Sequence, residues 1–259
     1  MLRLEFNNYT KIFILITLFF TASCSNKERE SLKIATAANM QYAMKELTSS
    51  FHKRTGIKCD IIVSSSGKLT AQIKEGAPYD VFVSADMKFP NELYTSGFTF
   101  NKPKVYAFGK LILWTLDESL QPNLKLLENL TIKHIAVANP KTAPYGSAAE
   151  ELLKNEQLYT KIKNKFVFGE SVAQTNQFIT TMAAEVGFTA KSVVFSPQMK
   201  GKDNWIDLDD NNYTPISQGI VILKNDAIKI ESAQKFYNFL YSVEGKKILT
   251  KYGYEVLTE

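Results

Sequence analysis

The sequence has few of the residues that support disulfide frameworks, metal centres or histidine-dependent catalysis. Its 259 residues include two cysteines and two histidines, so at most one disulfide can form. His52 lies in a segment flanked by Lys and Arg, and His134 precedes a strand-like run, so a catalytic Ser–His pair is not favoured. These shortages exclude a disulfide scaffold and weigh against a hydrolase.

Blocks of like charge are also missing. The chain carries 31 Lys and Arg against 26 Asp and Glu, a net charge of +5, and the basic residues are spread along its length. A nucleic-acid-binding surface usually shows as a cluster of basic residues. We therefore expect a solvated, lysine-rich surface and no nucleic-acid partner. The hydrophobic fraction of 45% fits a globular protein with a large core.

Catalytic and nucleotide-binding motifs are absent as well. There is no Gly-x-Ser-x-Gly, no His-Glu-x-x-His and no pair of Cys-x-x-Cys motifs. The string Gly67-Lys68-Leu69 only partly matches a phosphate loop, because Leu69 stands where Ser or Thr is required and Ile62 stands where the upstream Gly is required.

The N-terminal residues 1–23 read as a signal peptide. Arg3 and Lys11 precede the apolar run 12–22, which is too short to cross a bilayer of about 30 Å but fits a signal-peptide core. The run ends in Thr-Ala-Ser before Cys24, an arrangement that resembles a bacterial lipobox. We expect cleavage before Cys24, lipidation of its thiol, and a location in the periplasm or on the outer face of the cytoplasmic membrane. The alternative is a plain secretory signal with an incidental cysteine.

Residues 24–31 form a short polar segment that we interpret as a tether. Lipidation of Cys24 would leave Cys59 as a single thiol. Cys59 lies in an alternating strand-like stretch, where a lone cysteine usually behaves as a small buried hydrophobic residue.

The rest of the chain alternates short apolar runs with helical patterns, which is typical of an α/β architecture with parallel strands. The expected strands are residues 32–36, 58–64, 80–84, 110–116, 135–138, 166–169, and 186–195 continued by 219–223. The expected helices are residues 40–55, 69–74, 89–96, 147–155, 175–185, 233–242 and 245–252, with a Pro-Tyr-Gly turn at 144–146 before the fourth.

Two strand-rich stretches, residues 110–116 and 215–223, divide the chain into similar halves. We therefore expect two α/β lobes joined by two crossing segments. Residues 32–111 and 218–259 would form lobe I, and residues 112–217 would form lobe II.

Small or polar residues recur just before the expected helices. They are Asn39, Ser66, Tyr145-Gly146 and Ser171-Val172. The start of a helix has backbone N–H groups without intrahelical acceptors and carries partial positive charge, so several such starts brought together would form an anion site. The alternative for each residue is ordinary capping, since Asn and Ser are favoured N-caps.

Several strings resemble the periplasmic molybdate-binding proteins of ABC transporters. The resemblance covers nearly all of residues 32–259 in order, and the Asp-Val-Phe-Val-Ser-Ala-Asp string at 80–86 is its most specific part. The matching strings are residues 33–44, 64–69, 72–86, 139–146, 169–172 and 252–254.

This resemblance implies a type II periplasmic-binding-protein fold, in which two lobes close on the ligand about a two-segment hinge. We therefore expect a monomer that captures molybdate, and also tungstate, and delivers it to an ABC permease. Lipidation of Cys24 would anchor this protein to the membrane. The protein would be no enzyme and would need no cofactor.

The family's ligands map onto four positions. Asn39 stands where many members have a serine whose hydroxyl and backbone N–H hold the oxyanion, and an Asn amide can donate there too. Ser66 matches a second hydroxyl donor. Tyr145 and Val172 stand where members offer backbone N–H groups. Many members also supply a tyrosine hydroxyl where this chain has Ala190, and our hypothesis is that the hydroxyl of Tyr145 replaces it.

The chemistry of these donors favours a fully deprotonated oxyanion. Molybdate is a dianion near neutral pH and only accepts hydrogen bonds, whereas hydrogen phosphate needs an acceptor, and the matched loops offer only Glu170. They contain no Arg for an organic carboxylate. Other binding proteins of this fold, for sulfate, phosphate or an organic acid, and an enzyme such as a deaminase or transferase are the alternatives.

Overall fold

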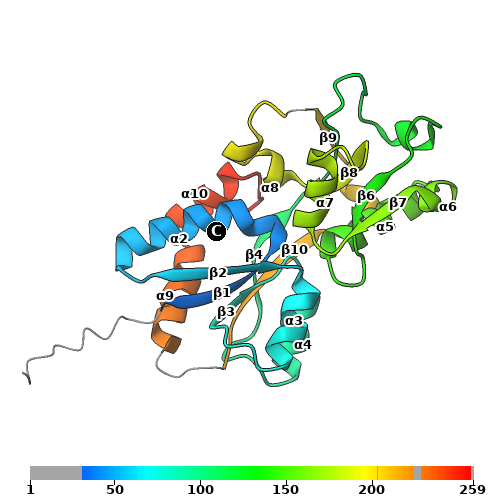
Figure 1. Ribbon diagram of the computed structural model, residues 1–259. Helices are drawn as coiled ribbons and strands as arrows, with labels where there is room; N and C mark the ends of the chain where they lie inside the picture. The colour runs from blue at the N-terminus through cyan, green and yellow to red at the C-terminus, as the bar shows by residue number, and fades with distance from the viewer. Residues whose placement is uncertain (1–30, 203, 225–228, 258–259) are drawn as a thin grey trace, which may run out of the picture. The chain divides into compact units, whose positions relative to one another are not determined.

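The computed structural model describes residues 31–202, 204–224 and 229–257 (Figure 1). The expected signal peptide, Cys24 and the tether up to residue 30 lie outside the described residues. No helix within the described ranges has the length and apolar character needed to cross a membrane. The described residues from Ser31 onward form one compact unit.

Within the described residues, one sheet has five strands in the order β2-β1-β3-β10-β4. β1 runs parallel to β2 and β3, while β10 runs antiparallel to both β3 and β4. The bounds are β1 Leu32–Ala37, β2 Cys59–Ser64, β3 Val81–Val83, β4 Lys104–Gly109 and β10 Ile216–Ile222.

A second described sheet has five strands in the order β7-β6-β8-β5-β9. β6 runs parallel to β7 and β8, and β5 runs antiparallel to β8 and β9. The bounds are β5 Leu111–Trp114, β6 Ile135–Ala138, β7 Phe166–Gly169, β8 Val186–Ala190 and β9 Trp205–Asp207. The α/β prediction is confirmed, but both sheets are mixed because β5 and β10 run against their neighbours.

Helices α2 to α8 lie between successive strands, and α9 and α10 follow the last strand. The α-helices are α2 Gln41–Thr55, α3 Ser66–Lys74, α4 Lys88–Thr95, α5 Pro144–Asn155, α6 Tyr159–Ile162, α7 Val172–Thr180, α8 Lys191–Val194, α9 Ile230–Leu240 and α10 Val243–Lys251. The 3-10 turns are η1 Ala38–Met40, η2 Leu124–Glu128, η3 Lys163–Lys165, η4 Pro197–Met199 and η5 Asp210–Asn212.

Helix α2 illustrates how periodicity produces the packing beside the first sheet. Met44, Leu47 and Phe51 follow one helical face and are fully buried. The ring of Phe51 meets that of Phe236 from α9 edge-on, with centroids 5.3 Å apart. The helix ends at Gly56, whose φ of 72° is the left-handed conformation that glycine adopts without strain.

The chain passes between the two sheets twice. β4 ends at Gly109 and β5 begins at Leu111, so Lys110 alone separates a strand of one sheet from a strand of the other. The return passes from β9 through η5 into β10, which pairs with β4 (Figure 1). Lys110 forms ion pairs with Asp210 of η5 and with Glu255 near the C-terminus, so both crossings are tied together.

Several predicted limits of helices and strands were wrong. Helices α3 and α9 begin at Ser66 and Ile230, each three residues earlier than predicted. The expected turn at 144–146 is the first turn of α5, because Pro is favoured at a first helical position. Helix α7 begins at Val172 and ends at Thr180, since the side chain of Ser171 caps it three residues earlier than predicted. The expected strand 186–195 ends at Ala190, and α8 follows it.

Cys59 is half-buried at the start of β2 and forms no disulfide in the described structure. Burial, together with the neighbouring charge of Asp60, raises the pKa of the thiol to about 12. The thiol is therefore uncharged near neutral pH, which fits the expected structural role.

Candidate oxyanion-binding site

The starts of four helical segments meet between the two sheets. η1 and α3 follow strands of the first sheet, and α5 and α7 follow strands of the second. Ala37, Ala38 and Ala85 from the first side belong to the same buried cluster as Tyr145 and Val172 from the second. Sequence positions more than a hundred residues apart are thereby brought together, as an anion site between two lobes requires.

The predicted donors occupy first-turn positions whose N–H groups have no intrahelical acceptor. The hydroxyl of Ser65 caps α3, and that of Ser171 caps α7, so the capping alternative is confirmed for Ser171. The capping alternative is therefore wrong for the Ser66 side chain. Ser66 and Val172 are instead the first residues of α3 and α7, and their backbone N–H groups point out of the N-terminal ends of these helices.

Ser66 is held so that its hydroxyl can donate. Its side chain is 0% exposed, and its Oγ accepts a hydrogen bond from the backbone N–H of Ala85 at 3.0 Å. Because the oxygen accepts from protein, the hydroxyl proton remains free for an acceptor. Ala85 belongs to the specific string at 80–86, so that string positions a candidate ligand.

Asn39 is buried and makes no capping hydrogen bond. Its Nδ2 donates to Gln218 Oε1 at 3.0 Å and to Tyr254 Oη at 2.9 Å, so both amide protons are used. Its Oδ1 is buried without a partner among the described residues. The Asn39 amide is thus held through its nitrogen alone. Its backbone N–H is the donor that Asn39 can still offer to an anion.

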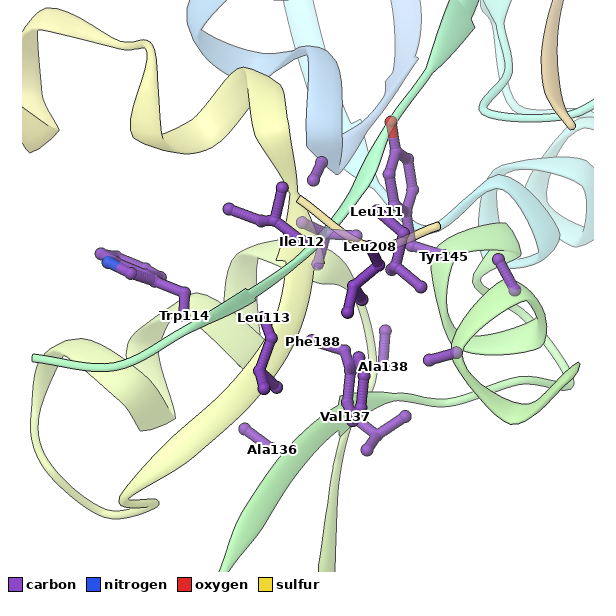
Figure 2. Close-up of a cluster of buried hydrophobic side chains, with 14 of the residues drawn as sticks. Leu111, Ile112, Leu113, Trp114, Ala136, Val137, Ala138, Tyr145, Phe188 and Leu208 are labelled. Carbon is purple, nitrogen blue, oxygen red and sulfur yellow. The ribbon is translucent and has the colours of Figure 1, made fainter. Parts of the chain in front are cut away.

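Tyr145 lies in the first turn of α5 with its ring among buried side chains of the second sheet. Figure 2 shows its hydroxyl pointing away from the aliphatic side chains around Leu113 and Val137. The hydroxyl accepts a hydrogen bond from Gln218 Nε2 at 3.1 Å. Burial raises the pKa of Tyr145 well above its ordinary value, so the hydroxyl keeps its proton.

Gly109 makes room for this arrangement. A Cβ at Gly109 would collide with the Tyr145 hydroxyl and with the Gln218 amide. At position 190, to which the resemblance assigns a tyrosine, Ala190 is fully buried and has no polar side chain. The hypothesis that the Tyr145 hydroxyl replaces that tyrosine stays a prediction.

Two contacts hold the sides of the site together at its edge. The backbone N–H of Gly67 donates to the carbonyl of Thr142 at 2.9 Å. A Cβ at Gly67 would lie 2.9 Å from Thr142 Cα, so only glycine allows this approach. Lys68 forms an ion pair with Glu170, whose carboxylate is 67% exposed. Glu170 is therefore paired with a cation at the solvent edge.

A second carboxylate, which sequence reasoning missed, lies close to these loops. Asp86 is half-buried, and burial raises the pKa of its carboxyl, although hydrogen bonds from Phe89 N–H and the Ser84 hydroxyl act in the opposite direction. These two bonds turn its Oδ1 toward its own chain. Within the described ranges, no cluster of three or more His, Cys, Asp and Glu could hold a metal ion.

Gln218 and Tyr106 are also site residues that sequence reasoning did not find. Nothing in the pattern of β10 marks Gln218, because a polar residue in a strand normally faces solvent. Tyr254 lies in a matched string, but its contact with Asn39 depends on the fold.

Comparison with known proteins identifies the family. Residues 32–255 match the family of bacterial extracellular solute-binding proteins. The chain belongs to this family. Within it, the molybdate-binding protein ModA of Azotobacter vinelandii is 35% identical over 235 residues, which cover 90% of this chain and 92% of that protein. ModA of Rhodobacter capsulatus is 35% identical over 221 residues, covering 85% and 86% of the two chains.

A solved structure agrees with this family membership. The periplasmic molybdate-binding protein of Azotobacter vinelandii superposes with a TM-score of 0.83 at 35% identity, covering 88% of this chain and 100% of that chain. The predicted type II periplasmic-binding-protein fold with two lobes is confirmed.

Proposed function

We propose that this protein is an extracytoplasmic solute-binding protein that captures molybdate and delivers it to an ABC transporter. The observation that carries the proposal is the meeting of four helical starts from two lobes, in a chain 35% identical to ModA over most of its length. The protein is a binding protein and performs no chemistry on its ligand, which is cargo and not a cofactor.

The proposed ligands are Asn39, Ser66, Tyr145 and Val172. Asn39, Tyr145 and Val172 offer backbone N–H groups, and Ser66 and Tyr145 offer hydroxyl protons. All of these groups donate, which suits a dianion that only accepts hydrogen bonds. Each hydrogen bond to a charged partner contributes about 1.5–3 kcal/mol, so a few such donors suffice for tight binding without a cationic side chain.

Closure of the lobes follows from the placement of these donors. All four residues are at most 5% exposed, so the oxyanion reaches them only when the lobes part. Parting breaks the hydrogen bond from Gly67 to Thr142 and the ion pair of Lys68 with Glu170. A bound anion that satisfies donors of both lobes binds the closed state more tightly and therefore shifts the population toward it.

The lobe limits, a lipid anchor on Cys24 and tungstate as a second ligand are further parts of the proposal. We assign residues 32–111 and 218–259 to lobe I and residues 112–217 to lobe II, limits that fall within the strands β5 and β10 at the two crossings. A lipid on Cys24 would hold a monomer at the membrane, in the periplasm or on the outer face of the cytoplasmic membrane. Tungstate has the same charge and the same need for donors, so we expect it to bind as well.

A thermal-shift panel tests the function. Ligand-free protein is heated with molybdate, tungstate, sulfate or phosphate. We expect the first two to raise the melting temperature, because a ligand that binds only the folded state stabilises it in proportion to the logarithm of its concentration. Stabilisation by sulfate alone would contradict molybdate binding and favour the alternative, a sulfate-binding protein of the same fold.

The anchor has its own test. The full chain and its Cys24→Ser variant are expressed in a bacterial host and fractionated. We expect the wild type in the membrane fraction and the variant in the soluble extracytoplasmic or uncleaved fraction. A wild type that is cleaved and soluble would favour the plain secretory signal.

A further inference from the structure

A buried polar network surrounds Gln218 on the crossing strand β10. Gln218 is 0% exposed and lies at a register irregularity where β10 pairs with β4. Its Oε1 accepts from the Tyr106 hydroxyl at 2.7 Å and from Asn39 Nδ2 at 3.0 Å. Its Nε2 donates to the Tyr145 hydroxyl at 3.1 Å. One amide therefore contacts three buried partners from distant parts of the chain.

Two of these partners are proposed oxyanion ligands from opposite lobes. Asn39 opens the segment that leads into α2, and Tyr145 lies in the first turn of α5. We propose that Gln218 is a positioning residue that joins these two ligands and sets the donor each presents to the oxyanion. This inference rests on the proposed function and deepens it.

On the Asn39 side, Gln218 fixes the side chain. The Asn39 amide has two hydrogen-bond partners, Gln218 and Tyr254, both through Nδ2. Its backbone carbonyl accepts from the hydroxyls of Ser192 and Tyr254 at 2.9 and 3.0 Å. Loss of Gln218 would remove half of what holds the amide and would free a buried N–H, which loosens the turn that carries the Asn39 backbone N–H.

On the Tyr145 side, Gln218 decides the direction of the hydroxyl proton. Because Nε2 donates to the Tyr145 oxygen, the Tyr145 proton points away from Gln218 and can be given to another acceptor, such as a bound anion. An acceptor at position 218 would reverse this bond. The Tyr145 hydroxyl would then donate to residue 218 and would be withdrawn from the oxyanion.

The variant Gln218→Glu tests this reversal of the hydrogen bond with Tyr145. The carboxylate only accepts hydrogen bonds, so the Tyr145 hydroxyl would donate to it, and the variant would also add a negative charge close to a dianion. When protonated, the carboxyl can donate to Tyr145 as the amide does. Burial favours the protonated form and raises a carboxyl pKa. Molybdate affinity of this variant should therefore fall about tenfold or more from pH 6 to pH 9, while that of the wild type changes little.

Gln218→Leu removes the network without adding charge. We expect its molybdate affinity to fall about tenfold to a hundredfold at every pH. The matched control is Ser217→Ala on the same strand, where the hydroxyl makes one long contact of 3.5 Å with a carbonyl. Its affinity should stay within about twofold of the wild type. Calorimetric titration with sodium molybdate measures all four proteins.

A double-mutant cycle in urea unfolding tests the bridge without any ligand. Gln218→Leu, Tyr145→Phe and the double variant are compared with the wild type, and the unfolding constants should depart from additivity by at least about threefold. Additive effects would overturn the inference whether or not molybdate binds. A wild type that gives no heat with molybdate, together with a non-additive cycle, would count against the proposed function and leave the bridge standing. Wild-type affinity in Gln218→Leu, or a flat pH profile in Gln218→Glu, would overturn the positioning role.

Discussion

Ser66→Ala removes a single oxygen from the centre of the proposed site. In the ligand-free protein that oxygen accepts from the Ala85 N–H at 3.0 Å in a fully buried position. The variant leaves this N–H without its partner, which should lower the free energy of unfolding by about 1–3 kcal/mol. It also removes a hydroxyl donor to a charged ligand, so molybdate affinity should fall about tenfold to a hundredfold.

Ser65→Ala separates these two effects. The Ser65 hydroxyl caps α3, and its loss should cost about 0.5–2 kcal/mol of stability, similar to the loss at Ser66. Ser65 offers no proposed donor to the anion, so its variant should bind molybdate within about threefold of the wild type. Urea unfolding measures the stabilities and calorimetric titration measures the affinities. Equal affinity in Ser66→Ala and Ser65→Ala would refute the assignment of Ser66 as a ligand.

Three further perturbations test the hydroxyl, the edge contact and the crossing. Tyr145→Phe should weaken molybdate binding about tenfold while Tyr145→Ala also lowers stability by about 3–5 kcal/mol; unchanged affinity in Tyr145→Phe, measured by titration, would eliminate the hydroxyl's role. Lys68→Gln breaks the exposed ion pair with Glu170 and should speed molybdate release up to about fivefold in stopped-flow measurements. This effect should vanish in high salt, which screens exposed charges. Release at the wild-type rate in low salt would contradict the role of the pair. Burial would raise the pKa of Asp210, but hydrogen bonds from Lys110 and Tyr213 outweigh it and hold that pKa below its ordinary value. The Asp210 carboxylate therefore stabilises the fold above about pH 4, by less than about 1 kcal/mol, and this is lost as the pH falls through its lowered pKa. The free energies of unfolding of Asp210→Asn and the wild type, measured in urea, should differ at pH 7 and converge at acid pH. A difference that stays constant with pH would exclude the Asp210 charge as its origin.

Much of the fold could be predicted because its core elements are periodic. The face of α2 that contains Met44, Leu47 and Phe51 is readable from spacing, and Gly56 marks its end. The strands β6 and β7 were predicted to the residue, since short apolar runs between turn residues have few other interpretations.

Other elements carry no such local signal. β4, β9 and α6 were not predicted, because β9 is a three-residue edge strand, α6 is a single turn, and β4 mixes polar and apolar residues without strict alternation. The antiparallel direction of β10 depends on where the returning chain enters the first sheet, which is a property of the whole topology. The start of α7 was missed by three residues because the cap at Ser171 precedes the apolar pattern.

The candidate site divides in the same way. Ser66 and Val172 could be proposed because a helix start has a local signature and a family motif. The partners that orient the ligands could not, because Gln218 meets Asn39 across 179 residues of sequence and Tyr145 across 73. Asn39 shows the consequence: the sequence suggests its amide as a donor, whereas the structure uses both amide protons within the protein and leaves the backbone N–H.

The amount of molybdenum bound per chain shows directly whether this protein binds molybdate. Purified protein, stripped of ligand by partial unfolding and refolding, is dialysed to equilibrium against micromolar sodium molybdate in the presence of excess sulfate and phosphate. Mass spectrometry then measures molybdenum on both sides of the membrane. We expect one molybdenum per chain at saturation. A protein compartment no richer in molybdenum than the buffer would show that this protein does not bind molybdate.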